Sequence, residues 1–322
     1  MFTRLYFFRL CFTGIFFLLL FSCSAVEDDK EVYLYSFFKG NGEDGLHLAY
    51  SYDGYIWEEL GESYSFLTPE VGQDKLMRDP CIIKGKDGKF HMVWTVSWNE
   101  KGIGYAQSSD LVNWSPQQYI PVMEHESKAR NAWAPEVYYD KQEDLYFIFW
   151  STTITDRYPE TQSEKENAYN HRIYYATTKD FKHFSETQLY YEPGFNVIDA
   201  TIAFDGKEYI MFVKDETIEP AEKNIRIARS SHLSSGFGPA GAPITGQYWA
   251  EGPTAIKINS RWIVYFDKYM DKKMGAVASK DLIHWEDISH QVSFPQGMRH
   301  GTVFQVTRKE FEKLQASVTD HK

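Results

Sequence analysis

Short apolar runs alternate with polar turns along the chain, and five of the runs end in versions of one phrase. Each copy alternates or runs apolar and then breaks at a polar turn, as strands do and helices do not. The five copies are AYSYDGYIW (49–57), AQSSDLVNW (106–114), ATTKDFKHF (176–184), ARSSHLSSGF (228–237) and VASKDLIHW (277–285). A strand-like unit that recurs about every fifty residues is typical of a β-propeller blade. The pattern therefore predicts an all-β fold, a five-bladed β-propeller.

A second repeat lies out of phase with the first and begins each time with a polar residue followed by small residues and an apolar run. Its copies are RDPCII (78–83), APEVYY (134–139), DATIAF (199–204), EGPTAI (251–256) and HGTVF (300–304). Turn dipeptides such as Asp87-Gly88 and Asp205-Gly206 separate these runs from a second apolar run, which predicts hairpins. We interpret the repeat as the innermost strand of each blade. The polar residues should then form one ring at the pore mouth: Asp79, Glu136, Asp199, Glu251 and His300.

The order of these fragments indicates how the ring closes. The chain begins with outer-strand material at 32–38 and 46–51, and it ends soon after an inner strand at 300–306. We therefore expect the C-terminal strand to complete the first blade and close the propeller, which would span residues 32–306. Residues 307–322 form a charged tail, expected to be a short helix or frayed.

Residues 1–22 have the features of a signal peptide: Arg4 and Arg9, an apolar run, and then Ser22-Cys23. The segment Leu20–Cys23 resembles a bacterial lipobox, so we expect an exported lipoprotein, periplasmic or on the cell surface, that meets the membrane only through a lipid on Cys23. Plain secretion and a transmembrane anchor are the alternatives. Residues 23–31 would be an acidic tether, similar to the export signal of surface lipoproteins in Bacteroides-type bacteria.

Charge and cysteine content narrow the range of partners. The net charge of −11 argues against nucleic acids and anionic substrates. Cys81 would remain as the one cysteine of the mature chain, and its place within an apolar strand indicates packing. The sequence contains no metal-ligand spacing and no phosphate-binding loop. We expect a monomer that needs no cofactor.

Aromatic residues make up 17% of the chain, and some of them do not fit the blade phrase. Trp98 follows the first hairpin, and Trp133 and Trp249 each come shortly before a carboxyl of the ring. Flat apolar rings beside carboxyls suit the C–H faces of sugars, so we interpret these three residues as walls of a sugar pocket. Core packing is the alternative, and we favour it for Trp94.

Three acids at the mouth of one pore are more informative than any single acid. A lone Asp before Pro, such as Asp79, usually caps a turn. Like charges that are held together raise the pKa of at least one of them. Two carboxyls of unequal pKa are what glycoside hydrolysis requires.

The motifs taken together resemble glycoside hydrolase family 43, five-bladed propellers with an inverting mechanism. The resemblance covers residues 32–306 and rests on RDP (78–80), WAPE (133–136), VIDA (197–200), EGP (251–253) and RHG (299–301). It implies that Asp79 is the general base, Asp199 the residue that modulates proton affinity, and Glu251 the general acid. It further places the residue matching Glu136 near the pocket, and over the pore a histidine, matched by His300, that contacts a metal or water in some members. Ala200 departs from the family pattern, where many members have Pro.

The resemblance implies an inverting, exo-acting glycosidase on α-L-arabinofuranosyl, β-D-xylosyl or galactan linkages. Glu251 must carry a proton near neutral pH, whereas Asp79 must be ionised. Arg299 would bind a sugar hydroxyl, keep Asp79 ionised, or form a structural ion pair. A neutral His300 is a poor Ca²⁺ ligand by itself, so we expect hydrolysis without an obligatory metal, although a Ca²⁺ ion near His300 stays open. The alternatives are a fructosidase of the sucrose-hydrolase type and a non-catalytic carbohydrate-binding propeller.

Overall fold

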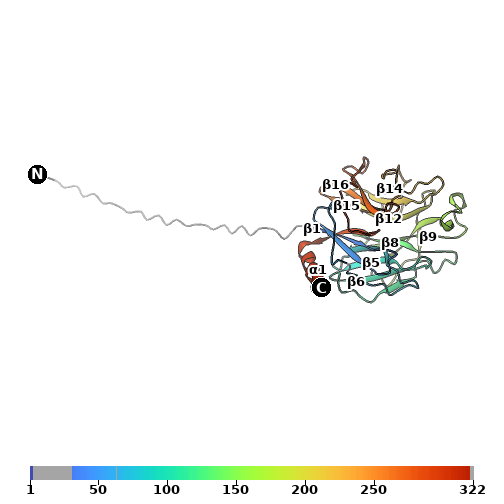
Figure 1. Ribbon diagram of the computed structural model, residues 1–322, viewed down its shortest axis with the longest axis horizontal. Coiled ribbons are helices and arrows are strands. Elements are labelled where there is room, and N and C mark those ends of the chain that lie inside the picture. The colour runs from blue at the N-terminus through green and yellow to red at the C-terminus, as the bar shows by residue number, and fades with distance from the viewer. Residues whose placement is uncertain (3–30, 63, 320–322) are drawn as a thin grey trace.

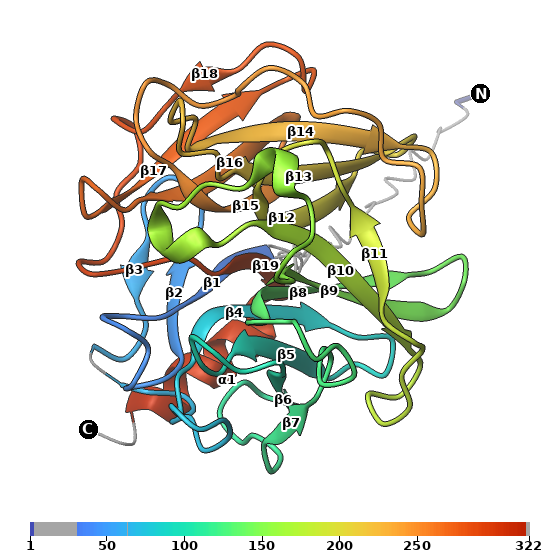
Figure 2. The same ribbon diagram turned by 90° about the vertical axis from the view of Figure 1, so that its right-hand side faces the viewer.

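A computed structural model describes residues 1–2, 31–62 and 64–319, and residues 3–22 of the expected signal peptide lie outside them. The described chain is built from five antiparallel sheets arranged around a centre (Figures 1 and 2). Four sheets have four strands and one has three. The all-β fold and the five-bladed propeller that the repeats predict are confirmed. Within the described residues, no helix is long and apolar enough to cross a membrane.

The innermost strand of each sheet is the one that the second repeat predicts. Neighbouring innermost strands contact one another around the centre, where Figure 2 places them. These strands are β4 (Arg78–Lys84), β8 (Trp133–Asp140), β12 (Val197–Phe204), β15 (Glu251–Ile258) and β19 (Thr302–Thr307). The first four form hairpins with β5 (Phe90–Thr95), β9 (Leu145–Thr153), β13 (Tyr209–Asp215) and β16 (Arg261–Lys268), whereas β19 pairs with β1 (Glu31–Phe37) from the other end of the chain.

The outer strands complete each blade. The third strands are β6 (Ile103–Ser108), β10 (His171–Thr178), β14 (Asn224–Ser230), β17 (Lys273–Ser279) and β2 (His47–Ser51). The fourth are β7 (Gln118–Ile120), β11 (Gln188–Tyr191), β18 (Glu286–Asp287) and β3 (Glu58–Glu59). Two single-turn 3₁₀ helices, Pro159–Thr161 and Glu166–Ala168, interrupt the long loop between β9 and β10.

The recurring phrase forms the turn that leads out of the third strand. In blade β4–β7, Ser108 Oγ accepts hydrogen bonds from the backbone N–H groups of Asp110 and Leu111. Asp110 Oδ1 accepts two more from the N–H groups of residues 112 and 113, an arrangement that a short polar side chain makes with its own turn. The same bonds form around Asp53, Asp180 and Asp281. The phrase therefore recurs because the turn requires it.

The divergent fifth copy coincides with the incomplete blade. His232 stands where the other copies have Asp, and an imidazole has no carboxylate oxygen to accept from the following N–H groups. Its sheet, β12–β13–β14, is the one with three strands. The segment that follows, residues 238–244, still donates three backbone hydrogen bonds to β14. It covers the edge of that sheet without forming a regular strand.

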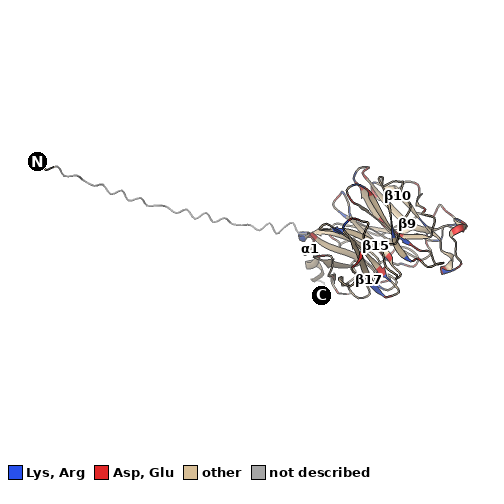
Figure 3. Cartoon of the chain, turned by 90° about the horizontal axis from the view of Figure 1, so that it is seen from above, with Lys and Arg blue, Asp and Glu red and all other residues tan. Residues whose placement is uncertain are grey.

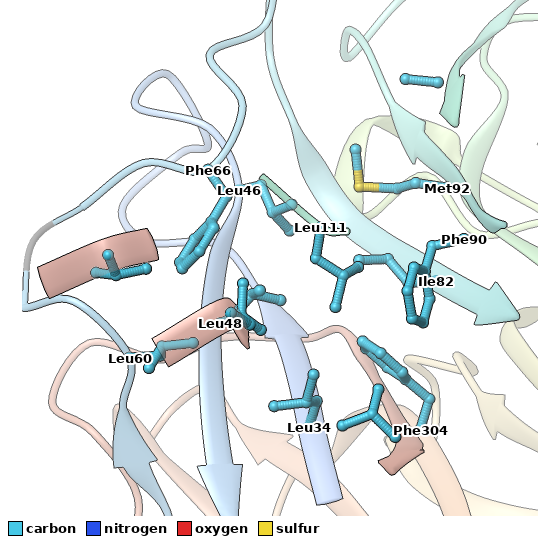
Figure 4. Close-up of a cluster of buried hydrophobic side chains, with 14 of the residues drawn as sticks. Leu34, Leu46, Leu48, Leu60, Phe66, Ile82, Phe90, Met92, Leu111 and Phe304 are labelled. Atoms are coloured by element: carbon cyan, nitrogen blue, oxygen red, sulfur yellow. The ribbon is translucent and has the colours of Figure 1, made fainter. Parts of the chain in front are cut away.

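The two ends of the propeller meet in one blade. The last strand, β19, pairs antiparallel with the first, β1, from Ser36 opposite Thr302 to Glu31 opposite Thr307. That this strand also holds the ring closed stays a prediction. The tail forms a helix, α1 (Arg308–Thr319), whose buried Phe311 joins the apolar cluster between two blades. Leu34 and Phe304 belong to the same cluster (Figure 4).

A bulge at the start of four of the five innermost strands decides which side chains reach the pore mouth. The pairing register shifts there in β4, β8, β12 and β15. One residue at each bulge has a positive φ: Asp79 (52°), Ala134 (45°), Asp199 (55°) and Gly252 (59°). The predicted ring was therefore wrong in register. Glu251 lies one residue before its bulge position and Glu136 two residues after, one step deeper in the channel.

Candidate active site

The bulges surround a cavity of about 250 Å³ at the pore mouth. Most of the side chains that the sequence predicts for the site line this cavity. They are Asp79, Trp98, Trp133, Asp199, Glu251, Arg299 and His300. Glu136 and Trp249 do not line it. The chain thus brings residues from five strand starts together in one place.

Asp79 is the carboxyl with the strongest support for its charged form. Its Oδ1 lies 3.2 Å from Nδ1 of His300, and its Oδ2 accepts a 2.8 Å hydrogen bond from Thr95. Burial alone would raise the pKa of Asp79, but the hydrogen bond and charge of His300, with help from Arg78 and Thr95, lower it to about 2. Asp79 is therefore an anion throughout the neutral range.

Asp199 lies in the opposite electrostatic situation. Burial, with the nearby acids Glu251 and Asp79, raises its pKa. The charges of His300 and Lys214 lower the pKa by a smaller amount, so that it lies at about 6. Its backbone N–H donates to Ser151 Oγ at 3.2 Å, and its Oδ2 accepts a 3.0 Å bond from the N–H of Gly252. Because Gly252 follows Glu251 directly, Asp199 fixes the backbone that carries Glu251.

Glu251 contacts two cations, one at each carboxylate oxygen. Lys214 Nζ donates to Oε2 at 3.1 Å, and Arg299 Nη2 donates to Oε1 at 2.9 Å. The other side of the guanidinium reaches Asp267 Oδ2 at 3.1 Å. Of the three roles considered for Arg299, the structure shows the ion pair, which Arg299 forms with Glu251 and Asp267. The cation beside Asp79 is His300.

His300 is buried against the glycine of the next blade. A Cβ on Gly252 would lie 2.2 Å from His300 Cγ, so this approach requires glycine. Burial lowers the pKa of His300, but its hydrogen bond to Asp79 and the surrounding carboxyls outweigh burial and raise it to about 9. The neutral imidazole assumed from the sequence is thus corrected to a charged one.

A charged His300 does not suit the Ca²⁺ ion that the fold family suggests. Both nitrogens of an imidazolium are donors, and Nδ1 already faces Asp79. Arg78, Lys214 and Arg299 also line the cavity, whereas Ca²⁺ takes six to eight oxygen ligands. Over the described ranges, no group of three or more His, Cys, Asp or Glu side chains is placed to hold a metal ion. These residues do not fit calcium, and no step below uses one.

Two tryptophans form one wall of the cavity. Trp98 and Trp133 meet edge to face with ring centroids 5.3 Å apart, and Trp133 Nε1 donates to the Trp98 carbonyl at 3.0 Å. The Arg78 guanidinium lies 4.2 Å from the Trp98 ring, which holds that ring in place. Trp98 remains 40% exposed, so its surface is accessible from solvent.

Glu136 and Trp249 lie elsewhere. Glu136 is buried in the channel, where it accepts hydrogen bonds from Thr201 (3.0 Å) and Thr302 (2.8 Å). Burial raises the pKa of Glu136 to about 7, although these two threonines and His300 lower it. Trp249 packs against Tyr269, a cavity residue, with centroids 5.9 Å apart. Their positions give them indirect contact with the cavity through these neighbours.

Sequence reasoning missed the residues that come from the second strands. Each stands opposite the residue that precedes a bulge, and each contacts the start of the next blade. The four are Thr95, Ser151, Lys214 and Asp267. A polar residue at the end of an otherwise apolar run was the available signal. Glu216, which also lines the cavity, follows Lys214 by two residues.

The fold and the cluster of acids define a propeller of the glycoside hydrolase kind. The pattern of a family described as "Probable glycosyl hydrolase domain", related to family 43, matches residues 28–312. The chain belongs to this family, and the resemblance seen in its motifs is confirmed.

Individual relatives agree with this assignment. A protein of Bifidobacterium longum named alpha-L-arabinofuranosidase is 26% identical over 62% of this chain, which spans 23% of that relative's length. An alpha-L-arabinofuranosidase from Lactobacillus brevis has the same fold, with a TM-score of 0.52 and 20% identity over 66% of this chain and 72% of that one. A thermostable family-43 glycoside hydrolase matches with a TM-score of 0.55 and 17% identity over 71% and 82%.

Proposed function

We propose that this protein is an inverting, exo-acting glycoside hydrolase. The observation that carries the proposal is the convergence of Asp79, Asp199 and Glu251 on one cavity in unlike electrostatic surroundings. Asp79 is kept anionic beside a charged His300, whereas Asp199 is a buried carboxyl whose pKa of about 6 lies well above its usual range. Two carboxyls with separate roles are what acid–base cleavage of a glycosidic bond requires.

In this proposal Asp79 is the general base and Glu251 the general acid. Asp79 takes a proton from the water that attacks the anomeric carbon, while Glu251 gives a proton to the leaving oxygen. His300 keeps Asp79 ionised and orders the attacking water or a sugar hydroxyl beside it. Asp199 holds Glu251 through the backbone of Gly252. Inversion requires room for the water, which corresponds to carboxyls about 6.5–9.5 Å apart.

The cavity favours a single small sugar. Its volume of about 250 Å³ lies below the roughly 300–1,000 Å³ of pockets that enclose drug-sized ligands. The exposed Trp98 offers a flat apolar face for sugar C–H groups. We propose an α-L-arabinofuranosyl residue as the preferred substrate, because the B. longum relative carries the name alpha-L-arabinofuranosidase. β-D-Xylosyl and galactan linkages are the other candidates.

A panel of substrates tests this function. The purified mature chain is assayed with aryl α-L-arabinofuranoside, β-D-xyloside and β-D-galactoside, and with arabinan, xylan and galactan. We expect release of single arabinose units and loss of that release in Asp79→Asn. Binding of oligosaccharides without turnover would overturn the enzymatic proposal and leave a carbohydrate-binding propeller. Turnover of sucrose or fructans alone would instead indicate a fructosidase.

We also propose that the chain is an exported lipoprotein and acts as a monomer. The support is the sequence of residues 1–31, with Cys23 as the lipid-bearing residue. In the native bacterium, Cys23→Ala should release the protein from the membrane fraction and abolish metabolic labelling with palmitate. Light scattering should give the mass of one chain. A Cys23→Ala protein that stays in the membrane fraction would contradict the lipid anchor.

A further inference from the structure

Lys214 is a buried cation that lies between two carboxylates. Its Nζ donates a 3.1 Å hydrogen bond to Oε2 of Glu251 and lies 2.6 Å from Oε2 of Glu216. Lys214 is 2% exposed, and desolvation, which favours the neutral amine, is outweighed by these two carboxylates, so that its pKa is well above the usual value. The ammonium therefore stays charged and is shared by Glu251, the expected acid, and by Glu216.

The observed contacts are those in which a carboxylate at Glu251 accepts most strongly. An ammonium and a guanidinium are donors without any acceptor, so neither can accept the O–H of a protonated carboxyl, and each bonds a hydroxyl oxygen more weakly than a carboxylate oxygen. Lys214 and Arg299 together occupy both oxygens of Glu251. When Glu251 takes up the proton that a general acid must deliver, the contact at the protonated oxygen weakens, and the cation on that oxygen is the one free to move away.

The surroundings of the two cations decide which one leaves. Arg299 is held on its far side by Asp267, lies 5.3 Å from the ring of Phe38, and makes its shorter contact with Glu251. Lys214 makes its shorter contact with Glu216, and its flexible stem lets Nζ turn between partners.

Glu216 is prepared to receive the ammonium. Its buried Oε2 already lies 2.6 Å from Nζ of Lys214, so the ammonium keeps this ion-pair partner when it leaves Glu251. Its Oε1 is fixed 2.8 Å from Lys223, which is fully buried and also pairs with Glu166 of the loop between β9 and β10. Glu216 therefore stays in place when Lys214 moves.

On the basis of the proposed glycosidase function, the geometry points to Lys214 as a positioning residue that alternates between Glu251 and Glu216. It binds Glu251 while that carboxylate is charged, and it withdraws to Glu216 when Glu251 holds a proton on Oε2. The proton comes from solvent and goes to the leaving oxygen, after which Lys214 returns. Lys214 and Glu216 thus act in opposite directions on proton uptake by Glu251, because one favours its charged form and the other draws that cation away.

Other charged or titratable groups also face Glu251 and act on the same equilibrium. They come from every packed element: Asp199 of β12, Asp267 of β16, Tyr269 after β16, Arg78 of β4 and Arg299 before β19. Lys214 differs from all of them because it has a second, closer carboxylate partner. Substitutions of Lys214 and Glu216 should therefore act in opposite directions.

A crystal structure of Glu251→Gln tests the geometry without any assay of activity. The amide imitates a protonated carboxyl and offers one acceptor oxygen. We expect Arg299 to keep its contact, and Nζ of Lys214 to move beyond about 4 Å, outside ion-pair distance, while it stays on Glu216. If Lys214 remained and Arg299 left, the proposal would be overturned, whatever the protein's activity.

The pH dependence of kcat/KM provides the second test. Lys214→Met removes the cation that opposes protonation, so the alkaline limb should move up by about one pH unit. Glu216→Gln confines Lys214 to Glu251, so the limb should move down by about the same amount. Lys214→Arg should return the limb toward the wild-type position. Thermal unfolding identifies any variant that does not fold. If either Lys214→Met or Glu216→Gln fails to fold, the direction in which the limb moves in the other variant decides whether the inference holds.

A matched control separates this role from the loss of any buried lysine. Lys268 ends β16, is 9% exposed and pairs with Asp271 away from the cavity. Lys268→Met should leave the alkaline limb unchanged. Limbs that do not move, or that move in the same direction in Lys214→Met and Glu216→Gln, would refute the inference. If the wild-type protein cleaves no glycoside, the proposed function fails, and the Glu251→Gln structure alone decides whether Lys214 alternates.

Discussion

Replacing His300 by alanine should change the pH range in which the protein works, because His300 is the closest cation to Asp79. The Asp79 Oδ1–His300 Nδ1 distance is 3.2 Å, and the His300 side chain is 7% exposed. With His300 present, the pKa of Asp79 is about 2, below its ordinary 3.8, although burial acts in the other direction. Without His300, burial is opposed only by Arg78 and Thr95, and the pKa of Asp79 should rise above 3.8.

The size of the expected effect follows from this change in the pKa of Asp79. A shift of roughly two pH units corresponds to about 2–3 kcal/mol between the charged and neutral forms of the base. The wild-type kcat/KM should therefore show no acid limb down to the lowest pH at which the protein stays folded. In His300→Ala an acid limb should enter the measurable range above about pH 4.

The same pair makes a prediction for stability with a defined sign. The depressed pKa of Asp79 stabilises the fold above pH 3.8, and this contribution is lost as the pH falls through about 2. The raised pKa of His300 stabilises the fold below pH 6.5, and this contribution is lost as the pH rises through about 9. The difference in unfolding free energy between wild type and His300→Ala should thus be largest between pH 4 and 6.5.

Two measurements test whether His300 keeps Asp79 ionised: kcat/KM on an aryl glycoside from pH 3 to 9, and urea unfolding over the same range. His183→Ala is the matched control, because His183 makes a 2.8 Å contact with Asp180 but its side chain is 87% exposed. The control should change neither profile. If the acid limb of His300→Ala stayed where it is in the wild type, His300 would not be what keeps Asp79 ionised.

Four further outcomes are expected. Glu251→Gln should lose most activity on natural linkages and far less on substrates with excellent leaving groups, whereas Asp79→Asn should lose both; equal, small losses would contradict the assigned roles. Proton NMR of the first-formed product should show the inverted anomer, and a retained anomer would exclude this mechanism. Activity should survive EDTA and dialysis, and a complete loss that calcium restores would show that a metal is needed. Gly252→Ala should lower the unfolding free energy by more than about 1 kcal/mol, since its Cβ would meet His300 at 2.2 Å, while Gly194→Ala, also at positive φ but with nothing within 4 Å, should cost less.

The sequence predicted the blades well because each blade carries its own local turn. Asp110 and its equivalents accept hydrogen bonds from N–H groups two and three residues ahead, so the signal is short-range and visible as a phrase. The same reasoning explains the divergent copy at His232, although the missing fourth strand there was not predicted. The pairing of β19 with β1 followed from the order of fragments alone.

The ring of carboxyls was predicted less accurately, because a bulge changes register by one residue without a clear mark in the sequence. Glu136 looked equivalent to Asp79 in the repeat, but the pairing places it opposite Phe149, where the equivalent residue of β4 is Cys81, opposite Val93. Ala134 is the residue that matches Asp79, and Glu136 lies two residues further along its strand, deeper in the channel. This is why Glu136 lies in the channel and not in the lining of the cavity.

The supporting residues were missed for a different reason, which also explains how the site is held rigid. Ser151, Lys214 and Asp267 each lie one or two residues before the end of the second strand of one blade, and each contacts the first strand, or its approach, in the next. Such contacts cross between blades and have no local sequence signature, since each partner lies 32 or more residues away. A site built in this way is positioned by contacts between neighbouring blades, and Glu251 in particular is held by Lys214, Arg299 and, through Gly252, by Asp199.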